Sequence, residues 1–151
     1  MHIEFKTGVQ NMHFDAVTWW LAETYWSPGI TKEEVMYGAQ NSSLVVGGFD
    51  EAGEQRSYMR VVSDKVRFAY VLDVIVHPEY RKRGIGKAMV AFAMQHPDLQ
   101  LVYQWLLRTR DAQNVYTRLG FKTMENTCNW MMIRNERPDR RIFSLRENKN
   151  G

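Results

Sequence analysis

The sequence has few of the residues from which a disulfide-built, metal-built or membrane-embedded protein is made. Cys128 is the single cysteine, which excludes an internal disulfide, and the four histidines are too scattered to give the ligand spacing of a structural metal site. No apolar run reaches the roughly 18 residues of a membrane-spanning helix, and the first residues lack the charged-then-apolar order of a signal peptide. With 151 residues, 44% hydrophobic and 25% charged, the chain is predicted to form one soluble, cytoplasmic domain around a single core.

Net charge is also small, and it is concentrated at one end of the chain. The formal charge is +3. Residues 134–151 hold six basic and three acidic side chains and so account for the whole net positive charge. Residues 1–133 hold 14 basic and 14 acidic side chains. We therefore predict a folded domain over residues 1–133, a basic tail over residues 134–151, and no nucleic-acid or membrane partner. Three apolar residues of the tail favour packing on the body or on a second subunit, as in a homodimer: Ile142, Phe143 and Leu145.

Local signals in the first forty residues predict two helices. Asp15 is expected to cap a helix that packs Trp19 and Trp20 into the core. Thr31 and Glu34 have the spacing of a capping box, which predicts the start of a second helix.

The chain as a whole alternates strands with helices. Runs of β-branched and apolar residues between turn residues predict strands, and the longest run is expected to be a central strand covered on both faces. The expected strands are residues 2–6, 43–49, 57–62, 66–76, 99–107, 121–124 and 130–133, and the later helices residues 85–93 and 111–119. This order predicts an α/β fold with one mixed central β-sheet flanked by helices on both faces.

One segment, VIVHPEYRKRGIGK at residues 74–87, combines features that fit a phosphate ligand. A buried strand ends, a basic loop follows, and Gly84 and Gly86 open a helix. Backbone N–H groups and the positive end of the helix dipole can approach an anion there. The common nucleotide motifs do not fit, because a P-loop requires glycine in place of Arg81 and a dinucleotide fingerprint requires glycine in place of Met89. We therefore expect a pyrophosphate-bearing ligand that is held in another way.

The same segment resembles the acyl-CoA signature of the GCN5-related N-acetyltransferases (GNAT). Arg81-x-x-Gly84-x-Gly86 matches that family's Arg/Gln-x-x-Gly-x-Gly/Ala motif, and residues 76–80 look like the strand-to-loop lead-in that precedes it. Further along, residues 116–121 (YTRLGF) are similar to the family's Tyr-x-x-x-Gly-Phe element. The two motifs in this order are more specific than either alone.

The resemblance implies that acetyl-CoA is the acyl donor and that it binds where the central strand splays from its neighbour. Strand backbone would pair with the pantetheine arm, and loop N–H groups would hold the pyrophosphate. Thr109 stands where the family often has asparagine, so a hydroxyl is expected to contact the cofactor arm instead. No metal is expected. The implied cofactor-binding residues are Val74, Ile75, Val76, Arg81, Lys82, Arg83, Gly84, Ile85, Gly86, Lys87, Thr109 and Asn114.

The implied reaction is direct attack of an amine on the thioester in a ternary complex, without a covalent enzyme intermediate. Tyr116 is the expected acid for the departing thiolate, since a phenol has a pKa near ~10. Two residues are candidates for the general base that accepts the amine's proton. Asp73 interrupts an apolar strand and could take the amine's proton, directly or through water, or be a structural carboxylate paired with an arginine. Glu23 is a second candidate.

The acceptor site is expected beside the first helix, in the segment that commonly walls it in the family. Glu23, Tyr25 and Trp26 are the expected substrate-binding residues, because loops carry specificity. The acceptor is expected to be a small-molecule or peptide amine. Cys128 has no nearby histidine or lysine in the sequence to activate it, which argues against a cysteine nucleophile.

Two other functions are compatible with parts of the sequence. A CoA-binding sensor on the same fold would need no acid, so the presence of Tyr116 argues against it. A nucleic-acid-binding or ribosome-associated protein would have to use the tail, because the body is balanced in charge and shows no basic face interleaved with aromatic residues.

Overall fold

The computed structural model describes residues 1–140 and divides the chain into two compact units, residues 1–108 and residues 109 onward. The strands are β1 (Glu4–Thr7), β2 (Leu44–Phe49), β3 (Gln55–Ser63), β4 (Ala69–Val76) and β5 (Trp105–Leu106). The helices are α1 (Phe14–Ala22), α2 (Lys32–Gln40), α3 (Ile85–Met94) and α4 (Gln113–Thr117). Short 3₁₀ turns occupy Val9–Asn11, Pro78–Tyr80, Pro97–Leu99 and Thr127–Asn129.

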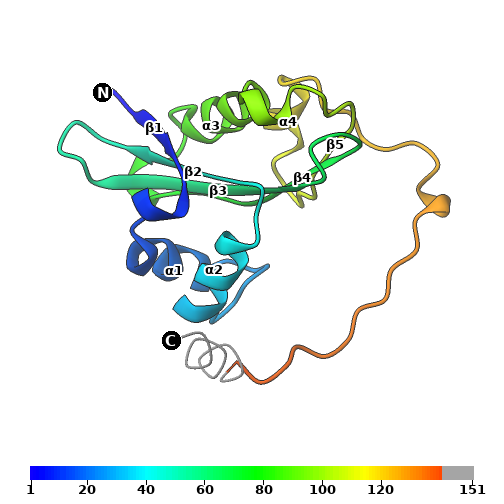
Figure 1. Ribbon diagram of the computed structural model, residues 1–151, viewed down its shortest axis with the longest axis horizontal. Coiled ribbons are helices and arrows are strands. Elements are labelled where there is room, and N and C mark those ends of the chain that lie inside the picture. Colours follow the sequence, from blue (N-terminus) through cyan, green and yellow to red (C-terminus); the bar gives the residue numbers. More distant parts are fainter. Residues whose placement is uncertain (141–151) are drawn as a thin grey trace. The chain divides into compact units, whose positions relative to one another are not determined.

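All five strands belong to one sheet in the first unit, in the order β1-β2-β3-β4-β5 (Figure 1). The pairings from β1 to β4 are antiparallel, and β4 pairs with β5 in parallel. The predicted mixed sheet is therefore confirmed, with β4 as an interior strand.

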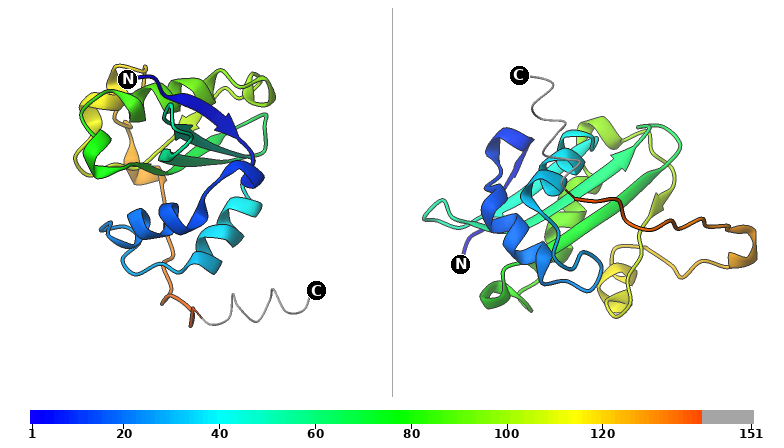
Figure 2. Two further views of the ribbon diagram at one scale, coloured as in Figure 1. Left: turned by 90° about the vertical axis from the view of Figure 1, so that its left-hand side faces the viewer. Right: turned by 90° about the horizontal axis from the view of Figure 1, so that it is seen from below.

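Helices cover both faces of the sheet, as predicted. α1 and α2 lie side by side on one face (Figure 2, left), and their apolar residues share the main core with Val45, Tyr58 and Ile75 of the strands. α3 lies on the opposite face (Figure 1), where the ring of Phe92 is 5.4 Å from that of Phe5 in β1.

The start of α2 follows the predicted capping box. The N–H of Glu34 donates to Thr31 Oγ1 at 3.4 Å, and the N–H of Thr31 donates to Glu34 Oε2 at 2.9 Å. The predicted cap of α1 is wrong. His13 is the N-cap residue, and Asp15 lies in the first turn, where its carboxylate pairs with Lys32 at 2.9 Å. An aspartate inside the first turn stabilises the helix through the dipole rather than by capping.

The β3–β4 turn is organised by Asp64, and it shortens the strand predicted from residue 66. Asp64 Oδ1 accepts the N–H groups of Val66, Arg67 and Phe68 at 3.0, 2.7 and 3.2 Å. These hydrogen bonds hold the pKa of the Asp64 carboxyl below its usual range. Because the three donors bond to one side chain, they cannot enter a strand ladder, and β4 begins at Ala69.

The two neighbouring tryptophans of α1 have different environments. Trp20 is buried at 4% exposure, as predicted, but Trp19 is 61% exposed. Consecutive residues of an α-helix point about 100° apart, so only one of them can face the sheet. The prediction that Trp19 packs in the core is wrong.

Three further predicted strands, beyond the one from residue 66, are shortened or missing. Within residues 99–107 only Trp105–Leu106 is a strand, because Leu99 is buried at the end of a 3₁₀ turn instead. Residues 121–124 and 130–133 form no strand in the described part of the chain. The second segment consists of large apolar side chains that are 56–95% exposed, and apolar composition alone does not supply the hydrogen-bonded partner that a strand requires.

The second unit contains α4 and the turn Thr127–Asn129 as its regular elements up to residue 140. The helix predicted over residues 111–119 is shortened to Gln113–Thr117, with Arg118 as its C-cap, and the chain then turns at Gly120, which takes a φ of +96°. The predicted apolar group of the tail lies outside the described residues, so the homodimer and the boundary at residue 133 stay predictions. No helix within residues 1–140 is both long and apolar enough to span a bilayer.

Candidate functional site

The segment between β4 and α3 has the strand–loop–helix form that the sequence predicts. Pro78 ends the strand and opens a 3₁₀ turn, with the side chain of His77 accepting the N–H of Glu79 at 3.2 Å. Lys82 and Gly84 then take left-handed φ values of +61° and +78°. The loop therefore turns sharply before α3 begins at Ile85, as a backbone must when it exposes successive N–H groups to an anion.

The start of α3 fits a pyrophosphate. Gly84 is the N-cap and has no side chain to accept the first N–H groups of the helix, which have no acceptor within the helix either. A Cβ built on Gly84 would meet no atom within 4 Å, so this side of the turn is open. A Cβ on Gly86 would stand 3.7 Å from Val76 and 3.9 Å from Val74, which puts the helix start directly over the end of β4.

The basic side chains of the loop differ in what they contact. Arg81 folds back on the strand, where its Nε donates to the carbonyl of Val76 at 3.0 Å, and its own N–H bonds to Pro78. The guanidinium of Arg83 lies over the ring of Tyr80, 5.2 Å from its centroid. Lys82 and Lys87 form no ion pair within residues 1–140. These two lysines are the basic groups best suited to contact a ligand's phosphates.

β4 has an open edge beside this loop. It pairs with β5 at two positions only, Ala69 with Trp105 and Tyr70 with Leu106. β4 continues for six residues beyond Tyr70. Over these residues one edge of β4 pairs with β3, and within residues 1–140 no strand pairs with the other edge. The backbone of Val74 to Val76 is thus available to an extended ligand, as the sequence-based expectation requires.

Asp73 is held by an arginine. Its Oδ2 accepts from Arg60 Nε at 2.7 Å, and the side chains of Asp73 and Arg60 are 12% and 22% exposed. Of the two roles expected for Asp73, this contact favours the structural carboxylate. The neighbouring Tyr58 is completely buried, and burial raises the pKa of its phenol, so it stays protonated.

Sequence reasoning missed a second polar cluster that braces the start of the loop. Arg56 Nε donates to Asp50 Oδ2 at 2.7 Å, the hydroxyl of Tyr80 donates to the same oxygen at 3.3 Å, and the guanidinium of Arg56 lies over the Tyr80 ring. The Arg56 hydrogen bond is the main reason that the pKa of Asp50 is lowered. An aspartate at the start of a turn was visible in the sequence, but its partners come from elements that only the fold brings together.

The expected acceptor residues lie at the C-terminal end of α1 and just after it. Glu23 is the exposed C-cap, and Tyr25 and Trp26 are 50% and 39% exposed with their rings edge to face at 5.0 Å. The ring of Trp20, in the last turn of α1, lies 5.8 Å from that of His77 at the end of β4. The structure thus brings this end of α1 to the end of β4. The loop of residues 77–84, called the glycine loop below, starts there and leads to α3.

The remaining expected residues belong to the second unit. Tyr116 is half-buried on α4, with its ring edge to face against Phe121 at 5.9 Å. Thr109 Oγ1 accepts the N–H of Ala112 at 3.0 Å, so this oxygen serves the turn before α4. Asn114 is exposed on α4, and its carbonyl accepts from a threonine hydroxyl.

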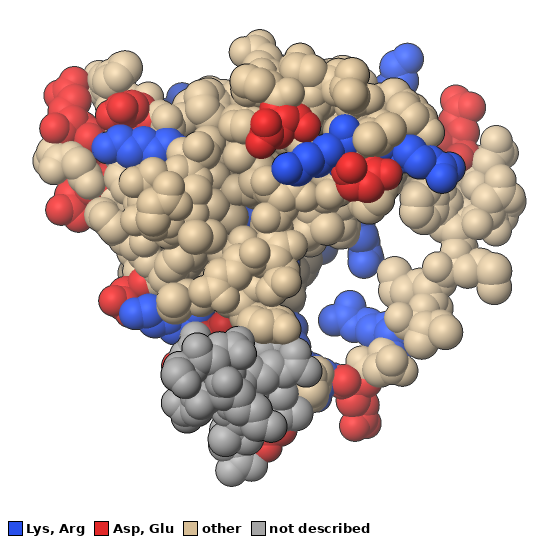
Figure 3. Space-filling view, viewed as in Figure 1, with Lys and Arg blue, Asp and Glu red and all other residues tan. Residues whose placement is uncertain are grey.

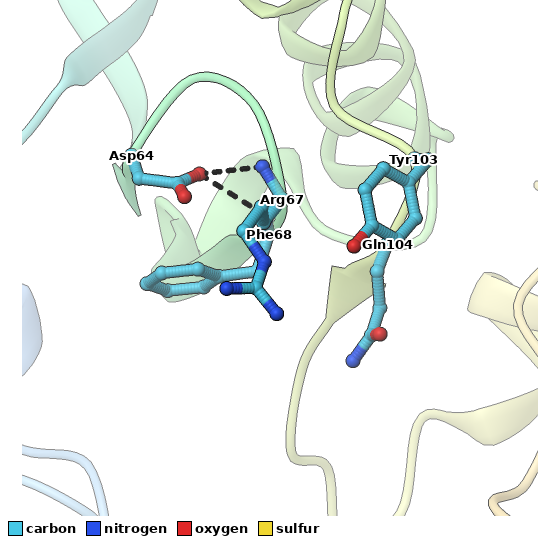
Figure 4. Close-up of a pocket in the computed structure, with 5 residues that line it drawn as sticks. All are labelled: Asp64, Arg67, Phe68, Tyr103 and Gln104. Atoms are coloured by element: carbon cyan, nitrogen blue, oxygen red, sulfur yellow. Dashed lines mark hydrogen bonds between the residues drawn. The ribbon is translucent and has the colours of Figure 1, made fainter.

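A hollow of about 280 Å³ lies at the other end of β4 and is not part of this site. It is lined by Asp64, Arg67, Phe68, Tyr103 and Gln104, and Figure 4 shows the Asp64 carboxylate bonded to the backbone of the turn rather than directed at a ligand.

Charges of both signs are mixed on the face shown in Figure 3, where acidic and basic side chains lie next to one another. The described part of that face therefore carries no continuous basic surface of the kind that binds nucleic acid. That no nucleic acid binds stays a prediction.

Comparison with known proteins identifies the fold. The family model of the acetyltransferase (GNAT) domain matches residues 33–123 of this chain. A solved GNAT-family protein from Xanthomonas campestris pv. campestris is 35% identical, with a TM-score of 0.81 over 90% of this chain and 94% of that chain. Comparison with curated protein sequences gave no match.

Two more distant structures share the fold alone. Glucosamine-6-phosphate N-acetyltransferase from Arabidopsis thaliana is 15% identical, with a TM-score of 0.67 over 89% of this chain and 99% of that chain. The aminoglycoside N-acetyltransferase AAC(6′)-Iy, solved in complex with CoA, is 13% identical, with a TM-score of 0.67 over 91% of this chain and 96% of that chain.

The family match covers more than half of the chain and includes both predicted motifs. The open edge of β4 and the glycine loop are the features that the resemblance to this family predicts for the acyl-CoA site. The chain therefore belongs to the GNAT family of acetyltransferases, whose acyl donor is acetyl-CoA.

Proposed function

We propose that the protein transfers the acetyl group of acetyl-CoA to a primary amine by direct attack in a ternary complex. The observation that carries this proposal is the open edge of β4, which runs from Tyr70 to the glycine loop at the start of α3. An unpaired strand edge that ends at a helix N-terminus suits a ligand with a long amide-bearing arm and a pyrophosphate.

The donor would be held mostly by backbone. Val74, Ile75 and Val76 offer N–H and carbonyl groups on the unpaired side of β4 to the pantetheine arm. The N–H groups of residues 82–87 and the dipole of α3 would hold the pyrophosphate, with charge from Lys82 and Lys87. The contact from Arg81 to the carbonyl of Val76 would keep the loop folded against the strand end.

When bound, acetyl-CoA supplies a thioester carbonyl that an amine can attack. Tyr116 would donate its phenolic proton to the departing sulfur. The carbonyl of Tyr116 accepts the N–H groups of Leu119 and Phe121, and its ring packs on Phe121. These contacts fix the residue within the YTRLGF turn.

The amine would approach along the end of α1. Tyr25 and Trp26 offer exposed aromatic surface, and the carboxylate of Glu23 attracts a protonated amine and can accept its proton, directly or through water. Asp73 is engaged by Arg60 and is the less suitable proton acceptor.

Release of free thiol from acetyl-CoA in the presence of a panel of amines tests this function. The panel should include a polyamine, an amino acid, a peptide, an amino sugar and an aminoglycoside. Amine-dependent release that Tyr116→Phe lowers about a hundredfold or more supports the proposal. Tight acetyl-CoA binding with no release on any amine would instead indicate a CoA-binding sensor.

A further inference from the structure

β4 carries a bulge at Asp73. Tyr58 and Arg60 of β3 are two residues apart, whereas their partners on β4, Ile75 and Leu72, are three apart. The extra residue is absorbed where Asp73 takes a φ of +56°. This left-handed conformation is uncommon for residues other than glycine, and aspartate tolerates it better than most. It persists only where the surroundings hold it.

An ion pair ties the bulge to α2. Arg60 Nε donates to Asp73 Oδ2 at 2.7 Å, with both side chains largely buried. The Nη1 of Arg60 donates to Ser42 Oγ at 3.4 Å, and that hydroxyl donates to the carbonyl of Gly38 at 2.7 Å. The aspartate that turns β4 is thus connected through the guanidinium to the last turn of a helix that packs on the sheet.

The bulge decides which way the following residues face. Beyond it, Ile75 points into the core with α1 and α2, and Val74 and Val76 lie under Gly86 at the start of α3. Because side chains alternate along a strand, losing the extra residue would exchange these two faces. The backbone groups that β4 presents on its open side would change with them.

We propose that the Arg60–Asp73 ion pair is a positioning device, which holds the bulge and so keeps the backbone of Val74 to Val76 aligned for the acyl donor. This inference rests on the proposed function. Asp73 then acts through the strand backbone rather than by moving a proton, and Arg60 acts through Asp73.

The groups around the pair agree with this role. Arg60 has one carboxylate partner within the described residues, so its charge is matched by Asp73. Tyr58 is two residues before Arg60 on β3, and burial raises the pKa of its phenol, so it stays neutral and does not compete with Asp73 for the guanidinium. Breaking the pair would leave a poorly hydrated carboxylate at the bulge, which favours its rotation toward water and relaxation of the backbone.

Four variants separate the positioning role from a proton-transfer role. Asp73→Ala removes the carboxylate and disfavours the positive φ, whereas Asp73→Gly removes the carboxylate but adopts that φ freely. Arg60→Met breaks the pair, and Arg60→Met with Asp73→Gly removes it while leaving a glycine at the bulge. Asp15→Asn, which breaks the exposed pair with Lys32 on α1 and α2, is the control. Each is measured for acetyl-CoA Kd by calorimetry, for kcat and KM, and for thermal unfolding.

We expect Asp73→Ala and Arg60→Met to raise the Kd and KM for acetyl-CoA about tenfold or more, with kcat at saturation nearly unchanged. Asp73→Gly and the double variant should stay within about threefold of the parent protein, because glycine restores the bulge without the pair. The control should bind as the parent does.

Two results would overturn the positioning role. One is a Kd for folded Asp73→Ala and Arg60→Met that equals the parent's. The other is a loss of kcat of about a hundredfold or more in Asp73→Gly with an unchanged Kd, which would make Asp73 the base. A parent protein that binds no acetyl-CoA would overturn the proposed function itself, and this inference with it.

Discussion

The indole of Trp20 meets the imidazole of His77 edge to face, with their ring centroids 5.8 Å apart. Trp20 belongs to the last turn of α1, which leads into Glu23, Tyr25 and Trp26, and His77 directly follows β4, which leads into the glycine loop. This contact therefore joins the expected acceptor segment to the expected donor segment at one end of the sheet.

Trp20 and Trp19 form a matched pair for testing that packing. Trp20→Ala should lower the free energy of unfolding by about 3–5 kcal/mol, because it empties a buried site next to Ile75 and the other core residues. Trp19→Ala, on the exposed side of the same helix, should change it by less than about 0.5 kcal/mol. Denaturant unfolding of both variants measures the difference, and equal losses would contradict the orientation of α1.

Gly86→Val should weaken acetyl-CoA binding about tenfold or more, because the branched side chain fills space between the helix start and the strand end where the pyrophosphate is expected. The first added carbon fits the fold, since it would stand at ordinary contact distances from Val74 and Val76. The variant should therefore remain folded by circular dichroism. Unchanged affinity in a calorimetric titration would refute the placement of the ligand on this loop.

Tyr116→Phe should lower kcat by roughly 10²–10³ while leaving the Kd for acetyl-CoA nearly unchanged, as is typical of the loss of a general acid. The substitution keeps the ring that packs on Phe121, so local structure is retained. Steady-state kinetics and calorimetry give the two quantities. Tyr103→Phe, an exposed tyrosine beside the hollow at the far end of β4, is the control and should behave as the parent protein. A kcat equal to the parent's in both variants would reduce Tyr116 to a packing residue.

Asp50 should contribute to stability in a pH-dependent way. Its hydrogen bond from Arg56, aided by the N–H groups of Glu54 and Ala52, lowers its pKa in the folded protein below the ordinary 3.8. The contribution is therefore fully present above the unfolded pKa and is lost as the pH falls through the lower folded value. Asp50→Asn should lower the Tm at pH 7 but not at a pH below the folded pKa.

Thermal unfolding over that pH range checks the sign of the Asp50 effect. Glu51→Gln, at an exposed position on the same turn, is the control and should have the parent protein's Tm at pH 7. A Tm deficit for Asp50→Asn that is as large in acid as at pH 7 would mean that the Arg56 hydrogen bond is not its source.

Features that depend on neighbours in sequence could be predicted well. The capping box of Thr31 and Glu34 requires only a few consecutive residues. The strand–loop–helix from β4 to α3 was equally readable, because each element is marked by residues within it: β-branched residues in the strand, proline after it and glycine before the helix.

Features that depend on distant partners could not be predicted. The strand expected at residues 130–133 has the right composition, but a strand exists only where another strand accepts its hydrogen bonds. The partner of Asp73 was likewise open, since the pairing with Arg60 depends on the register between β3 and β4 and on a bulge that alternation does not reveal. Trp19 and Trp20 differ in burial because the direction of a helix face is set by the sheet.

Binding of acetyl-CoA by β4 and the glycine loop is tested most directly by calorimetric titration of the full chain with acetyl-CoA and with its 3′-dephospho form. We predict micromolar binding of acetyl-CoA. Weaker binding of the dephospho form would place the 3′-phosphate on a basic side chain. Absence of binding at millimolar acetyl-CoA would contradict a donor site on β4 and this loop.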